Sequence, residues 1–246
     1  ISVVGKYTDL KDSYKSLNEA LIHGGIYNNL KVNINWINAE KLDIGEITNK
    51  LQKSNGVLVP GGFGERGIRG KIASIKFARE NDIPFFGICL GMQLSVIEIS
   101  RNLIGKQDSN STEFKTSNNP IVSLMTEWNN ENRIEKRDLT SDKGGTMRLG
   151  AYRAILKKGS KIHNIYNSDE ISERHRHRYE VDLSYTKDFE QKGFHFSGMS
   201  PDNILPEVIE SVNHKWFIGV QFHPELKSRP LAPHPLFSSF IKHCIK

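Results

Sequence analysis

The sequence predicts an α/β fold in which a doubly wound, mostly parallel central sheet is flanked by helices, as in flavodoxin-like proteins. Short apolar strands alternate with helical segments through the first hundred residues, and this alternation is typical of parallel strands joined by helical crossovers. Residues 55–60 include an uninterrupted Val-Leu-Val run, which is typical of a strand buried on both faces of such a sheet.

In chain order, strands are predicted at 2–5, 31–37, 55–60 and 84–88, and helices at 44–51, 68–80 and 92–103. A further helix is predicted to begin near Asp12 or Ser13, either of which is a suitable cap, and to end at the glycine pair 24–25. Residues 31–37 alternate between polar and apolar side chains, whereas the helical segments repeat their apolar side chains every three to four positions.

After Gly105 the pattern loosens, and the second half is predicted to add extra strands to the same core. These strands are expected at 121–125, 147–156, 194–200, 208–212 and 216–222, with polar loops at 107–119 and 129–145 and a closing helix at 235–246. No repeat or linker interrupts the chain, so one domain is expected over residues 1–246.

The composition is that of a globular protein, with 37% hydrophobic and 25% charged residues among 246. No apolar run reaches the roughly 18 residues that a membrane helix needs. The net charge of +6 comes from scattered lysines, which we interpret as an aid to solubility, with no nucleic-acid or membrane partner. Two cysteines, Cys89 and Cys244, indicate a reducing compartment, the cytoplasm. A chain that opens on a strand without methionine is predicted to be a piece of a longer protein or a processed chain.

Cys89 is the strongest candidate for chemistry. It lies in Gly-Ile-Cys-Leu-Gly at 87–91, between a predicted strand and a predicted helix, which is the arrangement of a nucleophile elbow. The N-terminus of the following helix favours the thiolate form of the side chain. The alternative is that Cys89 is a small buried hydrophobic residue, as many free cysteines are.

A cysteine nucleophile needs a base, and the base needs an orienting group. His223 follows the last predicted strand, so it is expected at the same edge of the sheet as Cys89, and Glu225 can accept a hydrogen bond from its imidazole. The alternative for His223 is an ordinary histidine at a strand end.

The loop Gly-Gly-Phe-Gly at 61–64 is expected to turn a backbone N–H toward an oxyanion. The N–H of Leu90 is the second donor that a tetrahedral intermediate requires. A phosphate-binding loop is excluded because Glu65 and Ile72 stand where that motif needs glycine and serine or threonine.

Residues 173–180 combine arginines and histidines. In an extended conformation, Arg174, Arg176 and Arg178 share one face and the histidines share the other. A guanidinium fork suits a carboxylate. No further metal-binding residue stands nearby, so no metal site is expected.

The chain resembles the class I (triad) glutamine amidotransferases, and within them the glutaminase halves of the CTP synthase family. The wider class shares the motifs at 60–64, 87–93 and 223–225. The CTP synthase family is marked by Val-Gly-Lys-Tyr at 4–7, Ser-Tyr-Lys-Ser-Leu-Asn-Glu-Ala-Leu at 13–21, Asn-Ser-Thr-Glu-Phe at 110–114, Gly-Gly-Thr-Met-Arg-Leu-Gly at 144–150 and Arg-His-Arg-His-Arg-Tyr-Glu at 174–180.

The resemblance implies that the chain is a cysteine-dependent glutaminase with the fold of the class I glutamine amidotransferases. It assigns Cys89, His223 and Glu225 to the triad, and the N–H groups of Gly62 and Leu90 to the oxyanion. It implies that the side chains of the following residues hold glutamine: Phe63, Gln93, Glu113 and Arg178. Glu113 would face the α-amino group and Arg178 the α-carboxylate, although the sequence does not separate Arg178 from Arg176.

The resemblance also implies partners outside this chain. A synthetase domain of the same polypeptide would use the ammonia to convert UTP to CTP with ATP and Mg²⁺, in a homotetramer activated by GTP. The segment from Thr146 to Arg148 is our hypothesis for the GTP-coupled loop. This domain itself is expected to need no cofactor.

Three alternatives stay open from the sequence. One is another triad amidotransferase, against which the motif at 174–180 argues. Another is a cysteine hydrolase of γ-glutamyl peptides. The last is a regulatory binding module with an inactive site, against which the intact triad argues.

Overall fold

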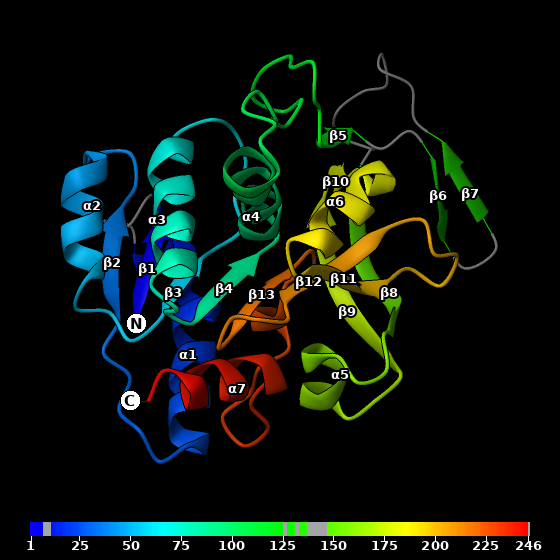
Figure 1. Ribbon diagram of the computed structural model, residues 1–246. Coiled ribbons are helices and arrows are strands. Elements are labelled where there is room, and N and C mark those ends of the chain that lie inside the picture. Colours follow the sequence, from blue (N-terminus) through cyan, green and yellow to red (C-terminus); the bar gives the residue numbers. More distant parts are fainter. Residues whose placement is uncertain (7–10, 125–126, 131–132, 137–146, 246) are drawn as a thin grey trace.

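The structure, a computed structural model, describes residues 1–6, 11–124, 127–130, 133–136 and 147–245. A nine-stranded sheet runs through this part of the chain in the order β2-β1-β3-β4-β13-β12-β11-β8-β9 (Figure 1). Its strands are β1 (Ser2–Gly5), β2 (Asn35–Asn38), β3 (Val57–Val59), β4 (Phe85–Ile88), β8 (Arg148–Leu156), β9 (Glu170–His177), β11 (Phe194–Met199), β12 (Pro206–Ser211) and β13 (Phe217–Val220).

The sheet has a parallel half and an antiparallel half. Strands β2, β1, β3, β4 and β13 are parallel to one another, and β12, β11, β8 and β9 continue the sheet with antiparallel pairings. This confirms the predicted fold class, including the extra strands of the second half. Two small pairs, β5 (Val122–Leu124) with β10 (Tyr179–Val181) and β6 (Glu127–Asn130) with β7 (Arg133–Lys136), lie outside the main sheet.

Helices cover both faces of the sheet (Figure 1). Alternate residues of β4 belong to different cores: Phe85 packs with α2, α3, α4 and α6, and Phe86 packs with α1, α5 and α7. The sheet is therefore buried on both sides, as its apolar strands predict. The helices are α1 (Lys15–Tyr27), α2 (Ile44–Leu51), α3 (Ile68–Glu80), α4 (Leu90–Ile99), α5 (Lys161–Tyr166), α6 (Thr186–Gln191) and α7 (Pro235–His243).

Helix α1 departs from the prediction at both ends. Its N-cap is Tyr14, which makes no side-chain capping bond, so the expected cap at Ser13 is wrong. The helix also continues through Gly24 and Gly25 to Tyr27. A Cβ atom on Gly24 would lie 2.8 Å from the carbonyl oxygen of Phe237 in α7. The glycine pair therefore allows close helix packing and does not end the helix.

Other predicted segments also differ in extent, among them the following three. Strand β2 begins at Asn35, because the strand that it pairs with begins only at Ser2. Helix α4 begins directly after Cys89 and passes into a wider π-helical turn over Ser100–Ile104. The predicted loop 129–145 contains part of the β6–β7 hairpin, and the rest of it lies outside the described residues.

Candidate active site

Three adjacent parallel strands carry the candidate groups at their carboxyl ends. Gly61 and Gly62 follow β3, Cys89 follows β4 and His223 follows β13. Ligands of doubly wound sheets bind at this edge. These residues line one cavity of about 300 Å³, together with Phe63, Glu225 and Arg176 among others. The fold therefore brings together groups that are more than 160 residues apart in the sequence.

Cys89 has the strained backbone expected of an elbow. Its φ of 52° and ψ of −104° lie outside the regions that most side chains occupy. Its backbone N–H donates to the carbonyl of Val220 over 2.7 Å, which ties the turn to β13. A Cβ atom on Gly91 would lie 2.1 Å from the carbonyl oxygen of Val59, and one on Gly87 would lie 2.8 Å from Gly91. Both glycines are thus required for α4 to begin so close to the sheet.

We expect Gly91→Ala to destabilise the fold by at least about 2 kcal/mol, because the methyl group forces α4 away from β3. Gly62→Ala is the matched control, since its Cβ atom would meet ordinary contacts, the nearest at 3.6 Å. Urea unfolding of both variants measures the difference. Equal stability of the two variants would show that the elbow does not depend on the Gly91 contact.

His223 and Glu225 are already paired. The imidazole Nδ1 lies 2.7 Å from Oε1 of Glu225, and the backbone N–H of His223 donates to the carbonyl of Arg174 in β9 over 2.8 Å. Pro224 begins a short 3₁₀ turn that brings Glu225 back toward the ring. With Nδ1 held by the carboxylate, Nε2 is the nitrogen that remains for proton transfer.

Gly61 makes room for the imidazole. A Cβ atom at this position would lie 2.7 Å from Cε1 of His223 and 3.5 Å from Cβ of Cys89. Sequence reasoning placed Gly61 in the glycine loop without this role. The contact depends on β13 lying next to β4, which the local sequence does not reveal.

The charges at the site favour a protonated histidine. Burial by itself lowers the pKa of His223, but the negative charges of Cys89 and Glu225 outweigh burial and raise the pKa to about 11. A group whose pKa is raised stays protonated up to that pH. The imidazolium form of His223 is therefore favoured through neutral pH.

We expect Cys89→Ala to lower the pKa of His223 from about 11 toward its ordinary value of 6.5, because the sulfur supplies the largest favourable charge. Proton–nitrogen NMR titration of the imidazole measures the change. Cys244→Ala, which removes the other free thiol, serves as the control and is expected to leave the titration unchanged. An unchanged titration in Cys89→Ala would show that the two side chains are not coupled.

The glycine loop lies against the start of α4. The Cβ position of Gly62 is 3.6 Å from Cδ2 of Leu90, so the two predicted oxyanion donors come from neighbouring residues in space. Lys6 Nζ donates to the carbonyl of Phe63, and the N–H of Gly64 donates to Oε1 of Glu113 over 2.7 Å. The loop is therefore held on both sides by charged side chains.

Of the predicted glutamine-holding residues, Phe63 lines the cavity, and Glu113 is bonded to the loop that contains Phe63. Burial raises the pKa of Glu113, and the positive charges of Lys6 and Arg178 act against the rise. Gln93 is buried and donates to the carbonyl of Tyr179 over 2.9 Å. Arg176 lines the cavity itself, and its carbonyl oxygen lies 4.0 Å from Sγ of Cys89.

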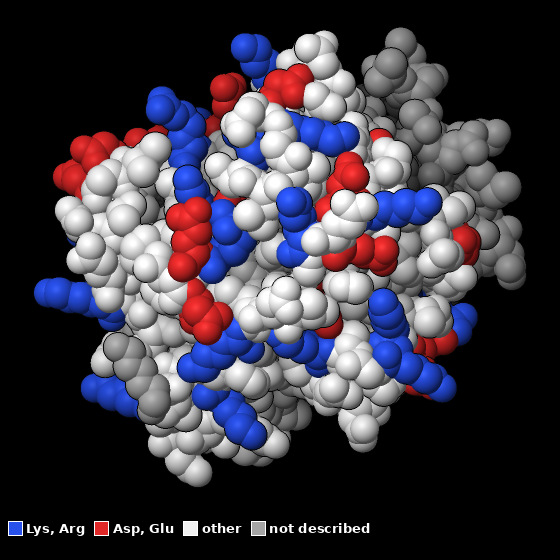
Figure 2. Space-filling view, in the orientation of Figure 1, with Lys and Arg blue, Asp and Glu red and all other residues white. Residues whose placement is uncertain are grey.

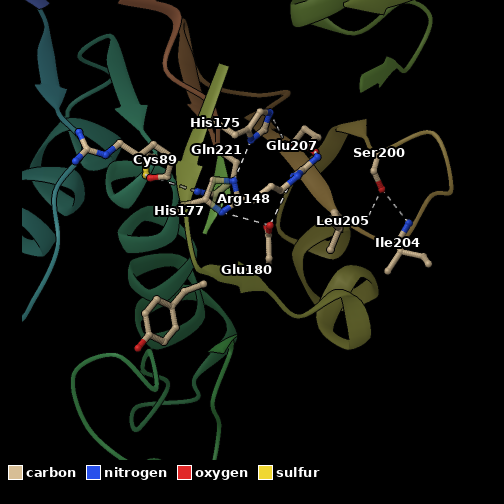
Figure 3. Close-up of polar contacts among 12 residues, drawn as sticks. Cys89, Arg148, His175, His177, Glu180, Ser200, Ile204, Leu205, Glu207 and Gln221 are labelled. Carbon is tan, nitrogen blue, oxygen red and sulfur yellow. Dashed lines mark hydrogen bonds and ion pairs between the residues drawn. The ribbon is translucent and has the colours of Figure 1, made fainter. Parts of the chain in front are cut away.

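Strand β9 confirms the predicted two-faced pattern for residues 174–177, and Arg178 lies half-buried just after the strand. His175 and His177 are buried, whereas Arg174 and Arg176 are exposed. Beneath the strand, both histidines join a buried network with three charged residues from other parts of the chain (Figure 3). The residues of this network are Arg148, His175, His177, Glu180 and Glu207.

The network holds the side chain of Arg148 in the interior of the protein. Its guanidinium Nη2 lies 2.6 Å from Glu207, and its side chain is 3% exposed. Burial lowers the pKa of this guanidinium, but Glu207 and Glu180 outweigh burial and raise it. Thr146 and Arg148 belong to the segment that is predicted to couple to GTP. Thr146 lies outside the described residues, and Arg148 is buried in the network.

Surface charge, hydropathy and the search for metal ligands add three observations. On the face shown in Figure 2, basic and acidic side chains are intermingled. Among the described residues, none of the helices has both the length and the apolar character to cross a membrane, and no cluster of histidine, cysteine or carboxylate side chains forms a metal site.

Known proteins match this chain and its fold. A profile of the family described as "Glutamine amidotransferase class-I" matches residues 9–243. The chain therefore belongs to the class I glutamine amidotransferases. Within this class, it matches the glutaminase domain of CTP synthases. A structure described as "Trypanosoma brucei CTPS - glutaminase domain with bound acivicin" superposes with a TM-score of 0.88 at 36% identity, covering 99% of this chain and 92% of the other.

Full-length relatives extend beyond this chain. The CTP synthase of Paramagnetospirillum magneticum is 57% identical over 246 residues, which is all of this chain and 46% of the relative. The CTP synthase of Brucella anthropi is 59% identical over 246 residues, which is all of this chain and 45% of the relative. The chain thus spans about half the length of these relatives. A glutamine amidotransferase from Thermotoga maritima, at 13% identity and a TM-score of 0.52 over 99% of this chain and 96% of the other, shares the fold alone.

Proposed function

We propose that this chain hydrolyses L-glutamine to glutamate and ammonia through a thioester on Cys89. The observation that carries the proposal is the juxtaposition at one sheet edge of a cysteine with a φ of 52° and a histidine whose Nδ1 is 2.7 Å from Glu225. A strained nucleophile beside an oriented base is the arrangement that acyl transfer requires.

In the first half of the reaction, the Cys89 thiolate attacks the carbon of the glutamine side-chain carboxamide. The C=O bond becomes a C–O⁻ bond, and the N–H groups of Gly62 and Leu90 stabilise the oxyanion. The intermediate collapses as the C–N bond breaks, and His223 gives its proton to the leaving nitrogen. The products of this step are ammonia and a γ-glutamyl thioester.

In the second half, neutral His223 takes a proton from a water molecule that attacks the thioester. The C–S bond breaks, glutamate leaves, and the thiolate and imidazolium are restored. The imidazole of His223 keeps the same tautomer throughout, because the carboxylate of Glu225 holds its Nδ1 atom.

Substrate recognition is proposed to involve Glu113 for the α-amino group and Arg178 for the α-carboxylate, with Gln93 and Phe63 beside them. These two substrate groups share one carbon, so their protein ligands must lie close together. Arg178 is among the cations that act on the pKa of Glu113, and Arg176 is not. This proximity supports Arg178 as the carboxylate ligand.

We expect Arg178→Gln to raise KM for glutamine by about 10- to 100-fold, because one charge-assisted contact is worth about 1.5–3 kcal/mol. Arg174→Gln is the matched control on the exposed face of β9 and is expected to leave KM unchanged. Steady-state ammonia release measures both variants. A rise in KM with Arg176→Gln and none with Arg178→Gln would transfer the role to Arg176.

The whole enzyme is proposed to be a CTP synthase of the cytoplasm. The ammonia would pass to a synthetase domain that aminates UTP to CTP with ATP and Mg²⁺, as part of pyrimidine nucleotide synthesis, in a homotetramer activated by GTP. The coverage of about 45% of the related CTP synthases supports a further domain. Two unpaired buried cysteines support a reducing compartment.

Ammonia and glutamate release from L-glutamine, compared with release from γ-glutamyl peptides, tests the proposal. We expect glutamine to be the preferred substrate, with little activity until the synthetase domain is present. A strong preference for γ-glutamyl peptides would instead favour a hydrolase.

A further inference from the structure

Gln221 contacts the sulfur atom from a fully buried position. It directly follows β13, and its backbone N–H donates to the carbonyl of Glu207 over 2.9 Å. Its side-chain Nε2 lies 3.8 Å from Sγ of Cys89 and is a donor to it, and its Oε1 accepts from Nε2 of Gln93 over 3.1 Å. Figure 3 shows the Gln221 side chain between Cys89 and the buried network.

The direction of the Gln221 amide is fixed by its neighbours. A backbone carbonyl only accepts, so Gln93 must turn its NH₂ group toward the carbonyl of Tyr179, 2.9 Å away. The second N–H of that group points to Gln221, which must therefore present its oxygen to Gln93. The NH₂ group of Gln221 is then left to face the sulfur atom.

We infer that Gln221 is an N–H donor to the Cys89 thiolate, which it holds in position for attack. A hydrogen bond from a neutral amide to an anion favours the anion over the neutral thiol. The Gln221 side chain also orients Gln93, because its oxygen accepts one of the two N–H groups of the Gln93 amide. This inference rests on the proposed cysteine chemistry, and it adds a residue outside the triad and the oxyanion donors.

The inference is tested by the rate of Cys89 alkylation with iodoacetamide as a function of pH, which needs no glutamine. Gln221→Met keeps the length of the side chain and removes the donor. We expect the midpoint of its alkylation profile to move up by about one pH unit, which lowers the rate near neutral pH about tenfold. Gln221→Glu places an oxygen against the sulfur and is expected to move the midpoint further.

Glutamine hydrolysis provides the second readout. In Gln221→Met, we expect kcat/KM to fall about tenfold near neutral pH and to recover as the pH is raised, which a merely structural role would not produce. Gln221→Asn, which retracts the amide by one methylene, is the second variant if Gln221→Met fails to fold. The midpoint of its alkylation profile is expected to rise as well. Thermal unfolding establishes that each variant is folded.

Alkylation midpoints equal to that of the wild type in folded variants would overturn the inference. The Gln221 substitutions could raise the midpoint of the Cys89 alkylation profile in a protein that does not hydrolyse glutamine even with its synthetase domain. That result would leave the inference intact and refute the proposed function. The two failures are therefore distinguishable.

Discussion

Cys89→Ala is expected to reduce ammonia release from glutamine by at least about 10³-fold, while the protein stays folded. The substitution removes the sulfur atom that is proposed to form the thioester and keeps the Cβ atom, so the packing of the elbow is preserved. The backbone strain at a φ of 52° is the same for alanine as for cysteine. Ammonia release in a coupled glutamate assay, with circular dichroism to establish folding, measures the outcome.

Cys244→Ala is the matched control, because Cys244 is the other free and buried cysteine. Its sulfur lies close to Gly56, in the core at the C-terminal end of α7. We expect this variant to retain full activity at a small cost in stability. A Cys89→Ala protein with wild-type activity would show that another residue is the nucleophile.

Arg148→Leu is expected to destabilise the fold by about 3–5 kcal/mol, because it leaves two buried carboxylates without their cation. Glu207 is fully buried and Glu180 is 5% exposed, and Arg148 Nη2 and Nη1 lie 2.6 Å and 3.6 Å from them, respectively. Burial raises the pKa of Glu207, so part of the loss is offset if this carboxyl binds a proton in the variant. Equilibrium unfolding in urea measures the change.

Arg153→Leu is the matched control for the network. Arg153 lies on the same strand and pairs with Glu170 of β9, but its side chain is 56% exposed and that of Glu170 is 40% exposed. An exposed pair contributes about 0–1 kcal/mol, so a small change is expected. A loss in Arg148→Leu no larger than in Arg153→Leu would mean that the buried network does not hold β9 in place.

The first half of the fold could be predicted because its signals are local. Helices α2 and α3 begin and end where the apolar periodicity places them, at Ile44–Leu51 and Ile68–Glu80. Asp43 and Glu46 form the capping box that fixes the start of α2. The candidate nucleophile was likewise predictable, because its flanking glycines are a local requirement of the turn.

The sequence alone could not predict the partners that arrive from distant strands. The glycine pair 24–25 looked like a helix end because α7, which needs the room, lies more than 200 residues later. The shared face of His175 and His177 was predictable by alternation, but the pairing of His175 with Glu207 depends on the sheet order. No sequence motif distinguishes a Gln221 that contacts the sulfur atom from one that packs as an ordinary residue at a strand end.

The most direct test of the proposed chemistry is to quench the protein with acid during glutamine turnover and to locate the acyl group by peptide mass spectrometry. A γ-glutamyl thioester is expected on the peptide that contains Cys89, and it is expected to disappear in Cys89→Ala and to persist in Cys244→Ala. Ammonia release without any adduct on Cys89, or with the adduct on another residue, would contradict the assignment of Cys89 as the nucleophile.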